Sequence, residues 1–212
     1  ALESLARLAE ERDLARIVWR TRRESIPVVE RRPVRVSLSG VAVPLPPGAF
    51  LQASEEAERM LVSEAVSGVG SRRPALDLYA GLGSFAFALS RTGPVHAVEG
   101  DPEAAAALAG AAATVEGVTV ERRDLARNPL PRETLARYAA AVFDPPRAGA
   151  LRQAAALAVS SVERVVAVSC NWATFARDAR ILVDGGFRLG RVQPVDQFVW
   201  SPHLEIVALF TR

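Results

Sequence analysis

Two residues near the C-terminal end of the chain have types that support covalent chemistry. Cys170, the only cysteine, ends the apolar run RVVAVSC, and Glu205 follows in the segment WSPHLEIV. A lone cysteine on an apolar strand is usually an inert core residue, but the strand-end position and polar neighbours of Cys170 favour a reactive role. Glu205 stands among apolar residues, where burial would raise its pKa and make it a usable base. His203 fits a structural or substrate-orienting role better than that of a nucleophile.

Further polar residues stand where predicted strands end. The segment DLYAGLGSFA holds Asp77, Gly81 and Gly83 at a strand-to-helix turn, where glycines let the backbone approach a ligand closely. Glu99 ends the next strand and can accept hydrogen bonds from both hydroxyls of a ribose. Asp124 ends the third strand, where it either contacts an adenine amino group or caps a turn. This pattern fits S-adenosylmethionine, although the glycine spacing also fits the dinucleotide fingerprint of nicotinamide and flavin enzymes.

The segment FDPPRAG ends a fourth predicted strand at Asp144. A dehydrogenase has no specific need for such a segment. Methyltransferases that act on flat nucleobases often carry an Asp/Asn-Pro-Pro segment here, beside the transferable methyl group. In those that methylate amino groups the next residue is usually aromatic, whereas here it is Arg147. Chemistry on an exocyclic amine is therefore disfavoured.

The elements that must position these residues alternate along the chain. Ser54 is the predicted N-cap of the first helix. Strands are predicted at 75–80, 95–100, 118–124, 139–146, 164–170, 187–196 and 204–210, with a helix after the first, second, fourth and fifth of them. This alternation predicts an α/β fold of the Rossmann-like type, with a mostly parallel seven-stranded sheet, helices on both faces and one antiparallel edge strand. Ligands of such sheets lie beyond the carboxyl ends of the strands.

The first 43 residues are too few to fold alone and are expected to be the tail of a domain whose beginning is absent, and residues 44–212 are expected to form a second, larger domain. The tail is predicted to hold an amphipathic helix, a strand near 17–19 and a hairpin that turns at Ser39-Gly40. Residues 1–40 carry nine Arg against six Asp and Glu, a stretch that either holds phosphates or forms a solvated surface. Seven of the nine stand in a window with only Glu24 and Glu30, and they are Arg16, Arg20, Arg22, Arg23, Arg31, Arg32 and Arg35.

Composition excludes several classes of protein. The single cysteine rules out an internal disulfide, and no Cys/His cluster indicates a structural metal or an iron–sulfur cluster in this chain. No signal peptide or membrane-spanning apolar run is present, so a reducing, cytoplasmic setting is expected. Nothing indicates a membrane or protein partner. The chain opens on Ala1, which fits an excised fragment or the removal of an initiator methionine.

Six segments together resemble the RNA uracil-C5 methyltransferases, which make 5-methyluridine in tRNA or 23S rRNA. They are PGAFLQAS, DLYAGLGSF, VEGD, DPPRAGA, SCNWATFARD and DQFVWSPHLEIVALF. The resemblance runs from about Pro44 to the C terminus and lacks the family's usual N-terminal OB-type domain. The sequence departs from the family at Trp172, where proline is common, at Ser54, where asparagine is common, and in the closing segment, which usually reads nearer DMFPxTxHxE. The residues at the nucleophile and base positions are kept despite these departures. The departures therefore concern the choice of RNA target more than the chemistry.

The resemblance implies a role for each site residue. Cys170 is the expected nucleophile, which adds to C6 of uracil, and Glu205 the expected base, which removes the C5 proton. The residues expected to bind the substrate are Gln52, Asp144, Phe50 and Arg147. Those expected to bind S-adenosylmethionine are Gln52, Asp77, Tyr79, Gly81, Gly83, Glu99, Asp124 and Asp144. RNA is the expected partner, and its target nucleotide must be flipped out of the stack.

Three alternatives stay open at this point. The first is a Rossmann oxidoreductase that binds NAD, for which Cys170 and Glu205 would have no purpose. The second is a methyltransferase that acts on cytosine C5 or on a base amino group. The third is a non-catalytic or incomplete RNA-binding module.

Overall fold

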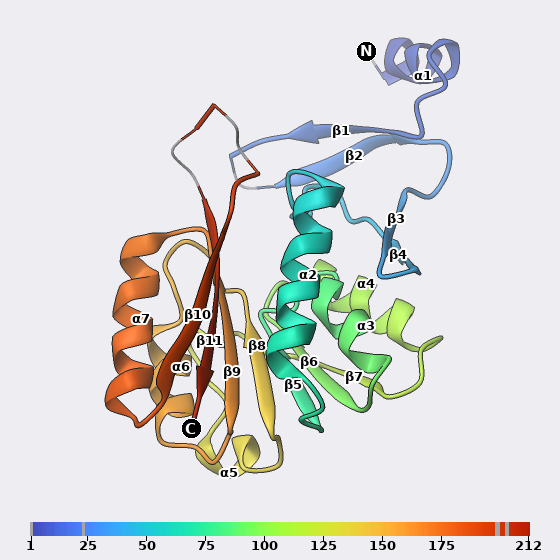
Figure 1. The fold of residues 1–212 in the computed structure, drawn as a ribbon. Helices are drawn as coiled ribbons and strands as arrows, with labels where there is room; N and C mark the ends of the chain where they lie inside the picture. The colour runs from blue at the N-terminus through green and yellow to red at the C-terminus, as the bar shows by residue number, and fades with distance from the viewer. Residues whose placement is uncertain (1, 23, 198–199, 202–203) are drawn as a thin grey trace.

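The body of the protein is a seven-stranded sheet (Figure 1), seen here in a computed structural model that describes residues 2–22, 24–197, 200–201 and 204–212. Across the sheet the strands are β10 (Arg188–Val195), β11 (Glu205–Thr211), β9 (Arg164–Ser169), β8 (Ala140–Phe143), β5 (Ala75–Leu78), β6 (Val95–Glu99) and β7 (Val118–Arg122). The five strands from β9 to β7 pair in parallel. The predicted α/β fold with a mostly parallel sheet is confirmed.

The two closing strands form the predicted antiparallel edge of the sheet, because β10 and β11 pair in antiparallel. β11 runs antiparallel to both of its neighbours, β9 and β10, and β10 forms the edge. The side chains explain this order. β11 is largely buried, whereas β10 is exposed along most of its length. The apolar last strand therefore inserts beside β9, and the polar strand before it stays outside.

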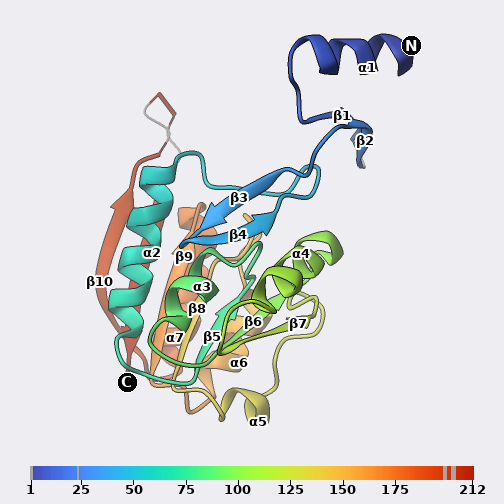
Figure 2. The same cartoon turned by 90° about the vertical axis from the view of Figure 1, so that its right-hand side faces the viewer.

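Helices cover both faces of the sheet (Figures 1 and 2). One face carries α2 (Glu55–Val69), α3 (Ser84–Ser90) and α4 (Pro102–Ala112), and the other carries α5 (Arg132–Leu135), α6 (Leu151–Ala158) and α7 (Trp172–Asp184). Successive residues of a strand point to opposite faces. On β5, for example, Ala75 packs in the cluster under α2, while Leu76 and Leu78 pack in the cluster under α6 and α7.

The helices that lead away from the site begin at well-formed caps. Ser54 accepts a hydrogen bond from the backbone N of Ala57, 3.1 Å away, as predicted for an N-cap. Asp101 caps α4, and Asn171 caps α7. Each of these short polar side chains satisfies N–H groups that the first helical turn leaves without a partner.

The N-terminal segment stands off the body (Figures 1 and 2). It consists of α1 (Leu2–Glu11) and an antiparallel pair, β1 (Arg16–Arg20) and β2 (Ser25–Glu30). A second pair, β3 (Arg35–Leu38) and β4 (Val41–Pro44), turns at the predicted Ser39-Gly40, both with positive φ, 49° and 86°. This second hairpin lies against the body, because Leu38 and Val43 are fully buried in the cluster under α2.

Several N-terminal arginines hold this segment together. Arg31 donates to the backbone O of Ala9 at 2.8 Å, and Arg31 and Arg32 both pair with Asp13. The guanidinium of Arg32, and then that of Arg31, lowers the pKa of Asp13. Arg16 donates to the backbone O of Leu45 at 2.9 Å. These three arginines thus have structural partners, and the predicted Arg23 lies outside the described residues.

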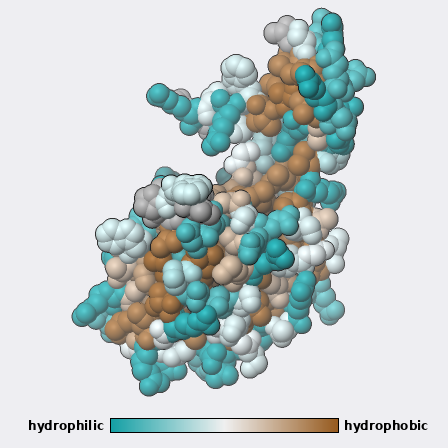
Figure 3. Space-filling model, turned by 45° about the horizontal axis from the view of Figure 1, so that its top comes forward, coloured by the Kyte–Doolittle hydropathy of each residue, from teal (hydrophilic) through white to brown (hydrophobic). Residues whose placement is uncertain are grey.

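Apolar side chains reach the surface on both the body and the N-terminal segment in the space-filling view (Figure 3). In the described part of the chain, no helix combines the length and apolar character needed to cross a membrane.

Candidate active site

A cavity of about 830 Å³ opens at the carboxyl ends of β5, β6, β8 and β9. It brings together all but two of the predicted site residues, although they come from seven separate segments. The members on its wall are Phe50, Gln52, Tyr79, Gly81, Glu99, Asp124, Asp144, Arg147, Cys170 and Glu205. Asp77 and Gly83 are not part of the lining. His203 lies outside the described residues.

Sheet register brings Cys170 and Glu205 face to face. β9 and β11 pair so that Ser169 lies opposite Ile206, and one further step of this register places Cys170 opposite Glu205. Because β11 is antiparallel, its first residue arrives at the carboxyl end of β9, where the cavity opens. Glu205 is buried and Cys170 is partly buried, and both line the cavity.

Carboxyl groups dominate the electrostatics of this part of the cavity. Burial and the nearby Glu205 raise the pKa of Asp144 to about 7. Burial raises the pKa of Glu205, against a hydrogen bond from Gln197 that lowers it. The pKa of Cys170 is also raised, by burial and then by Glu205 and Asp144, while Arg147 acts in the opposite direction. A cation bound beside these groups would favour their charged forms.

The glycine turn after β5 is held by Glu99. One carboxylate oxygen of Glu99 accepts from the backbone N of Gly81 and the other from the backbone N of Asp101, each at 2.7 Å. Gly81 has a φ of 55°, and a Cβ added there would meet nothing within 4 Å, so the cavity beside it is open. Gly83 serves packing instead, because an added Cβ would lie 2.5 Å from Leu108.

Asp77 lies beneath this turn. It is fully buried on β5, and neither carboxyl oxygen completes a hydrogen bond with a described residue. Burial raises its pKa to about 8, against the weaker influence of the backbone N–H of Ala86. A buried carboxyl without a partner is costly, and a cationic group in the cavity next to it would reduce that cost.

Two other predicted cofactor residues differ in their local contacts. Asp124 caps the turn after β7 by accepting from the backbone N of Ala126 at 3.0 Å, and it lines the cavity at the same time. Tyr79 has a positive φ of 62°, an unusual conformation for a bulky residue. Burial raises the pKa of its hydroxyl to about 12, helped by Asp178, and the hydroxyl has no hydrogen-bond partner among the described residues.

Sequence reasoning missed two residues of the site. Gln197 contacts both Gln52 and Glu205 through its amide nitrogen, at 2.9 and 3.1 Å. Its only sequence signal was its place in the closing segment DQFVWSPHLE. Glu58 on α2 lines the cavity, and burial raises its pKa against a hydrogen bond with Ser84. Because α2 is rich in glutamate, nothing in the sequence distinguishes Glu58 as a residue of the site.

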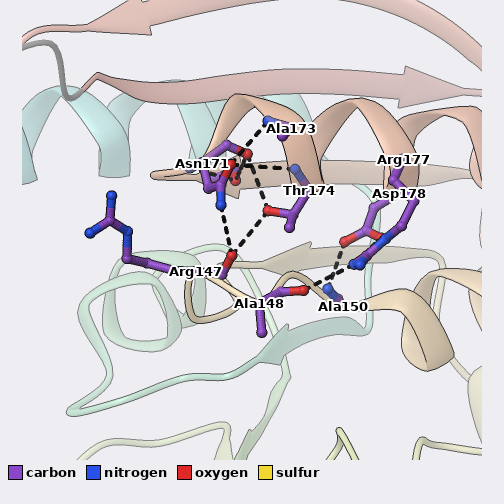
Figure 4. Close-up of polar contacts among 9 residues, drawn as sticks. Arg147, Ala148, Ala150, Asn171, Ala173, Thr174, Arg177 and Asp178 are labelled. Atoms are coloured by element: carbon purple, nitrogen blue, oxygen red, sulfur yellow. Dashed lines mark hydrogen bonds and ion pairs between the residues drawn. The ribbon is translucent and has the colours of Figure 1, made fainter.

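The loop that follows β8 is tied to the start of α7 (Figure 4). Asn171 and Thr174 both donate to the backbone O of Arg147, at 3.0 and 3.2 Å. Asp178 accepts from the backbone N of Ala150 at 2.6 Å and pairs with Arg177. The segment SCNWATFARD therefore supplies Cys170 and also anchors the loop that carries Asp144 and Arg147.

We expect Asp178→Ala to lower the free energy of unfolding by about 3 kcal/mol, because it leaves a buried N–H group and Arg177 without their partner. Equilibrium denaturation followed by circular dichroism measures this change. The matched control is Asp184→Ala on the same helix, where the Arg180–Asp184 pair is exposed and the expected cost is about 0.5 kcal/mol or less. Equal losses in the two variants would contradict the anchoring role.

All three tryptophans of the chain are exposed. Trp19 on β1 is 63% exposed, Trp172 at the start of α7 is 76% exposed, and Trp200 between β10 and β11 is 98% exposed. Phe50, on the cavity wall, is 75% exposed. Large aromatic side chains are usually well buried, so the exposure of Phe50 on the cavity wall and of Trp172 just after Cys170 indicates a surface available to flat ligands.

Comparison with known proteins identifies several that are similar to this chain. A family model described as tRNA (uracil-5-)-methyltransferase matches residues 45–212. A protein of Brucella melitensis named as an uncharacterized RNA methyltransferase is 46% identical over 99% of this chain and 50% of its own length. The 23S rRNA (uracil(1939)-C(5))-methyltransferase of Chromohalobacter salexigens is 36% identical over 97% of this chain and 46% of its own length. The chain thus spans about half the length of these curated relatives.

A solved structure is similar over the same extent. The tRNA (uracil-54, C5)-methyltransferase of Pyrococcus abyssi, solved with S-adenosyl-L-homocysteine, superposes with a TM-score of 0.77 and 25% identity. The match covers 93% of this chain and 51% of that protein. A methyltransferase from Streptococcus mutans, 12% identical with a TM-score of 0.62, shares the fold.

Proposed function

The chain belongs to the tRNA (uracil-5-)-methyltransferase family, and from this membership we propose that it transfers a methyl group from S-adenosylmethionine to C5 of a uridine in RNA. The observation that carries the proposal is that Cys170 and Glu205, at the adjoining ends of β9 and β11, line one cavity with Asp144. An oxidoreductase has no use for this pair. Cytosine matches the cavity less well than uracil does. Asp144 can accept a hydrogen bond from an N3–H group, which uracil has and cytosine lacks.

The residues of the cavity, together with Asp77 on β5 outside its lining, fit S-adenosylmethionine. Gly81 leaves open space for close approach, Glu99 ends β6 where a ribose can be bound, and Asp77 is a buried carboxyl without a hydrogen-bond partner among the described residues. A positively charged amino group or sulfonium near Asp77 and Asp144 would offset the burial of both carboxyls. Bound there, S-adenosylmethionine would supply an electrophilic methyl group.

In the proposed reaction, the residues of this chain turn the uracil ring into a nucleophile. The thiolate of Cys170 forms a bond to C6, and the electron pair of the C5–C6 double bond becomes available at C5 to take up the methyl group. Glu205 then accepts the C5 proton, the double bond re-forms, and the bond between C6 and sulfur breaks. Phe50, Gln52 and Asp144 hold the base for these steps.

We also assign catalysis to residues 44–212 and RNA contact to residues 1–43. The N-terminal segment stands off the body and presents exposed arginines, among them Arg20, Arg22 and Arg35. Their charge suits phosphates. Arg147, on the cavity wall, is placed to meet the phosphate beside the flipped nucleotide.

The test of this function is product analysis. The full-length protein is incubated with methyl-labelled S-adenosylmethionine and with RNA from cells that lack the gene, and the digested nucleosides are separated by mass spectrometry. We expect label in 5-methyluridine. Label in 5-methylcytidine or in an amino-methylated base would favour the second alternative, and binding of NAD without S-adenosylmethionine would favour an oxidoreductase.

A further inference from the structure

Gln197 lies between two residues of the proposed site and contacts both. It follows β10, and its amide nitrogen donates to Oε1 of Gln52 at 2.9 Å and to Oε1 of Glu205 at 3.1 Å. Its own Oε1 accepts from the backbone N of Ala53 at 3.1 Å. The side chain therefore joins the segment that holds Gln52 to the strand that holds Glu205.

The backbone of Ala53 fixes the orientation of this whole chain of hydrogen bonds. A backbone N–H can only donate, so the group of Gln197 that faces it must be the oxygen. The nitrogen of Gln197 then faces Gln52, and the atom of Gln52 that accepts must be Oε1. This leaves the amide nitrogen of Gln52, with its two N–H donors, as the amide group that is available to a ligand in the cavity that Gln52 lines.

We propose that Gln197 is a positioning residue that makes Gln52 a donor toward O4 of the target base and thereby selects uracil over cytosine. The inference rests on the proposed function. Uracil offers a carbonyl acceptor at O4 beside the N3–H donor, whereas cytosine offers an amino donor beside a bare N3. A donor on Gln52 next to an acceptor on Asp144 matches uracil at both positions and cytosine at neither.

The second contact of Gln197 acts on Glu205. Glu205 faces the carboxyl of Asp144 after β8 and the thiol of Cys170 after β9, and Arg147 lies on the same cavity. Burial raises the pKa of Glu205, and the hydrogen bond from Gln197 opposes it. Removal of the donor therefore raises this pKa further, and a higher pH is needed before Glu205 is ionised and can act as a base.

The test uses the full-length protein and a transcript that contains the uridine identified by product analysis, together with the same transcript carrying cytidine at that position. The variant Gln197→Met keeps the size of the side chain but removes its donor and acceptor. We expect its preference for uridine over cytidine, measured as the ratio of kcat/KM, to fall by about tenfold or more. We also expect the rising limb of its pH–rate profile to move to higher pH.

Two further variants separate this role from a structural one. Gln193→Met, also on the β10 side and outside the cavity lining, should leave preference and pH profile unchanged. Gln197→Glu keeps the acceptor for Ala53 but has no donor when ionised, so it should lose the preference even if Gln197→Met fails to fold. Wild-type protein that forms no 5-methyluridine would overturn the proposed function and this inference with it. Wild-type activity with unaltered preference and pH profile in a folded Gln197 variant would overturn this inference alone.

Discussion

We expect the Cys170→Ala protein to bind S-adenosylmethionine as the wild type does and to transfer no measurable methyl group to RNA. Uracil C5 is a poor nucleophile until a thiolate adds at C6, and loss of a covalent nucleophile commonly lowers kcat by about 10⁴-fold or more. Calorimetric titration measures cofactor binding, and incorporation of labelled methyl groups into RNA measures turnover. Because Cys170 is the chain's only cysteine, no neighbouring thiol can substitute for it.

The control for this experiment is a mutation of a residue beside the site that has no role in the proposed chemistry. Trp172→Pro restores the residue that is common in the family and leaves the thiol in place. We expect this variant to continue to methylate RNA, and any loss of methylation to come from weaker RNA binding. Full turnover by Cys170→Ala would remove the nucleophile assignment.

We expect Glu205→Gln to accumulate a covalent complex between protein and RNA. The thiolate of Cys170 can still add and the methyl group can still be taken up, but without a carboxylate to accept the C5 proton the bond between C6 and sulfur persists. A denaturing gel with labelled RNA detects the complex as a slower band. Addition of Cys170→Ala to the same protein should abolish the band, since no sulfur is then present.

Failure of this experiment has a clear meaning. If Glu205→Gln forms no stable complex, and the wild-type protein forms none with RNA that contains 5-fluorouridine, covalent addition is not part of the reaction. If Glu205→Gln turns over normally, another residue is the base, and the buried position of Glu205 between β9 and β10 is structural.

The sequence predicts most of the sheet because its strands are short apolar runs that alternate with helices. Polar residues such as Glu99, Asp144 and Cys170 stand where those runs stop, and the parallel order brings these ends to one edge of the sheet. The structure accordingly places them on one cavity. Their individual roles remain predictions that the variants above can test.

Other features depend on contacts between distant segments and leave little trace in local sequence. The position of β11 inside the sheet depends on which of the two closing strands is more apolar, a comparison between strands rather than a pattern within one. The hairpin of β1 and β2 has no glycine turn to mark it, and only the strand near β1 was predicted. Gln197 acquires a role only because the segment after Pro44 passes over the end of β10.

The exposure of all three tryptophans determines how the protein can be followed in solution. Indole emission changes on unfolding when a buried ring enters water, and Trp19, Trp172 and Trp200 already face water in the folded state. The intrinsic tryptophan fluorescence should therefore change little when this protein unfolds. The same rings are free to stack on nucleobases, so quenching of their emission should report the arrival of RNA directly, without any attached dye.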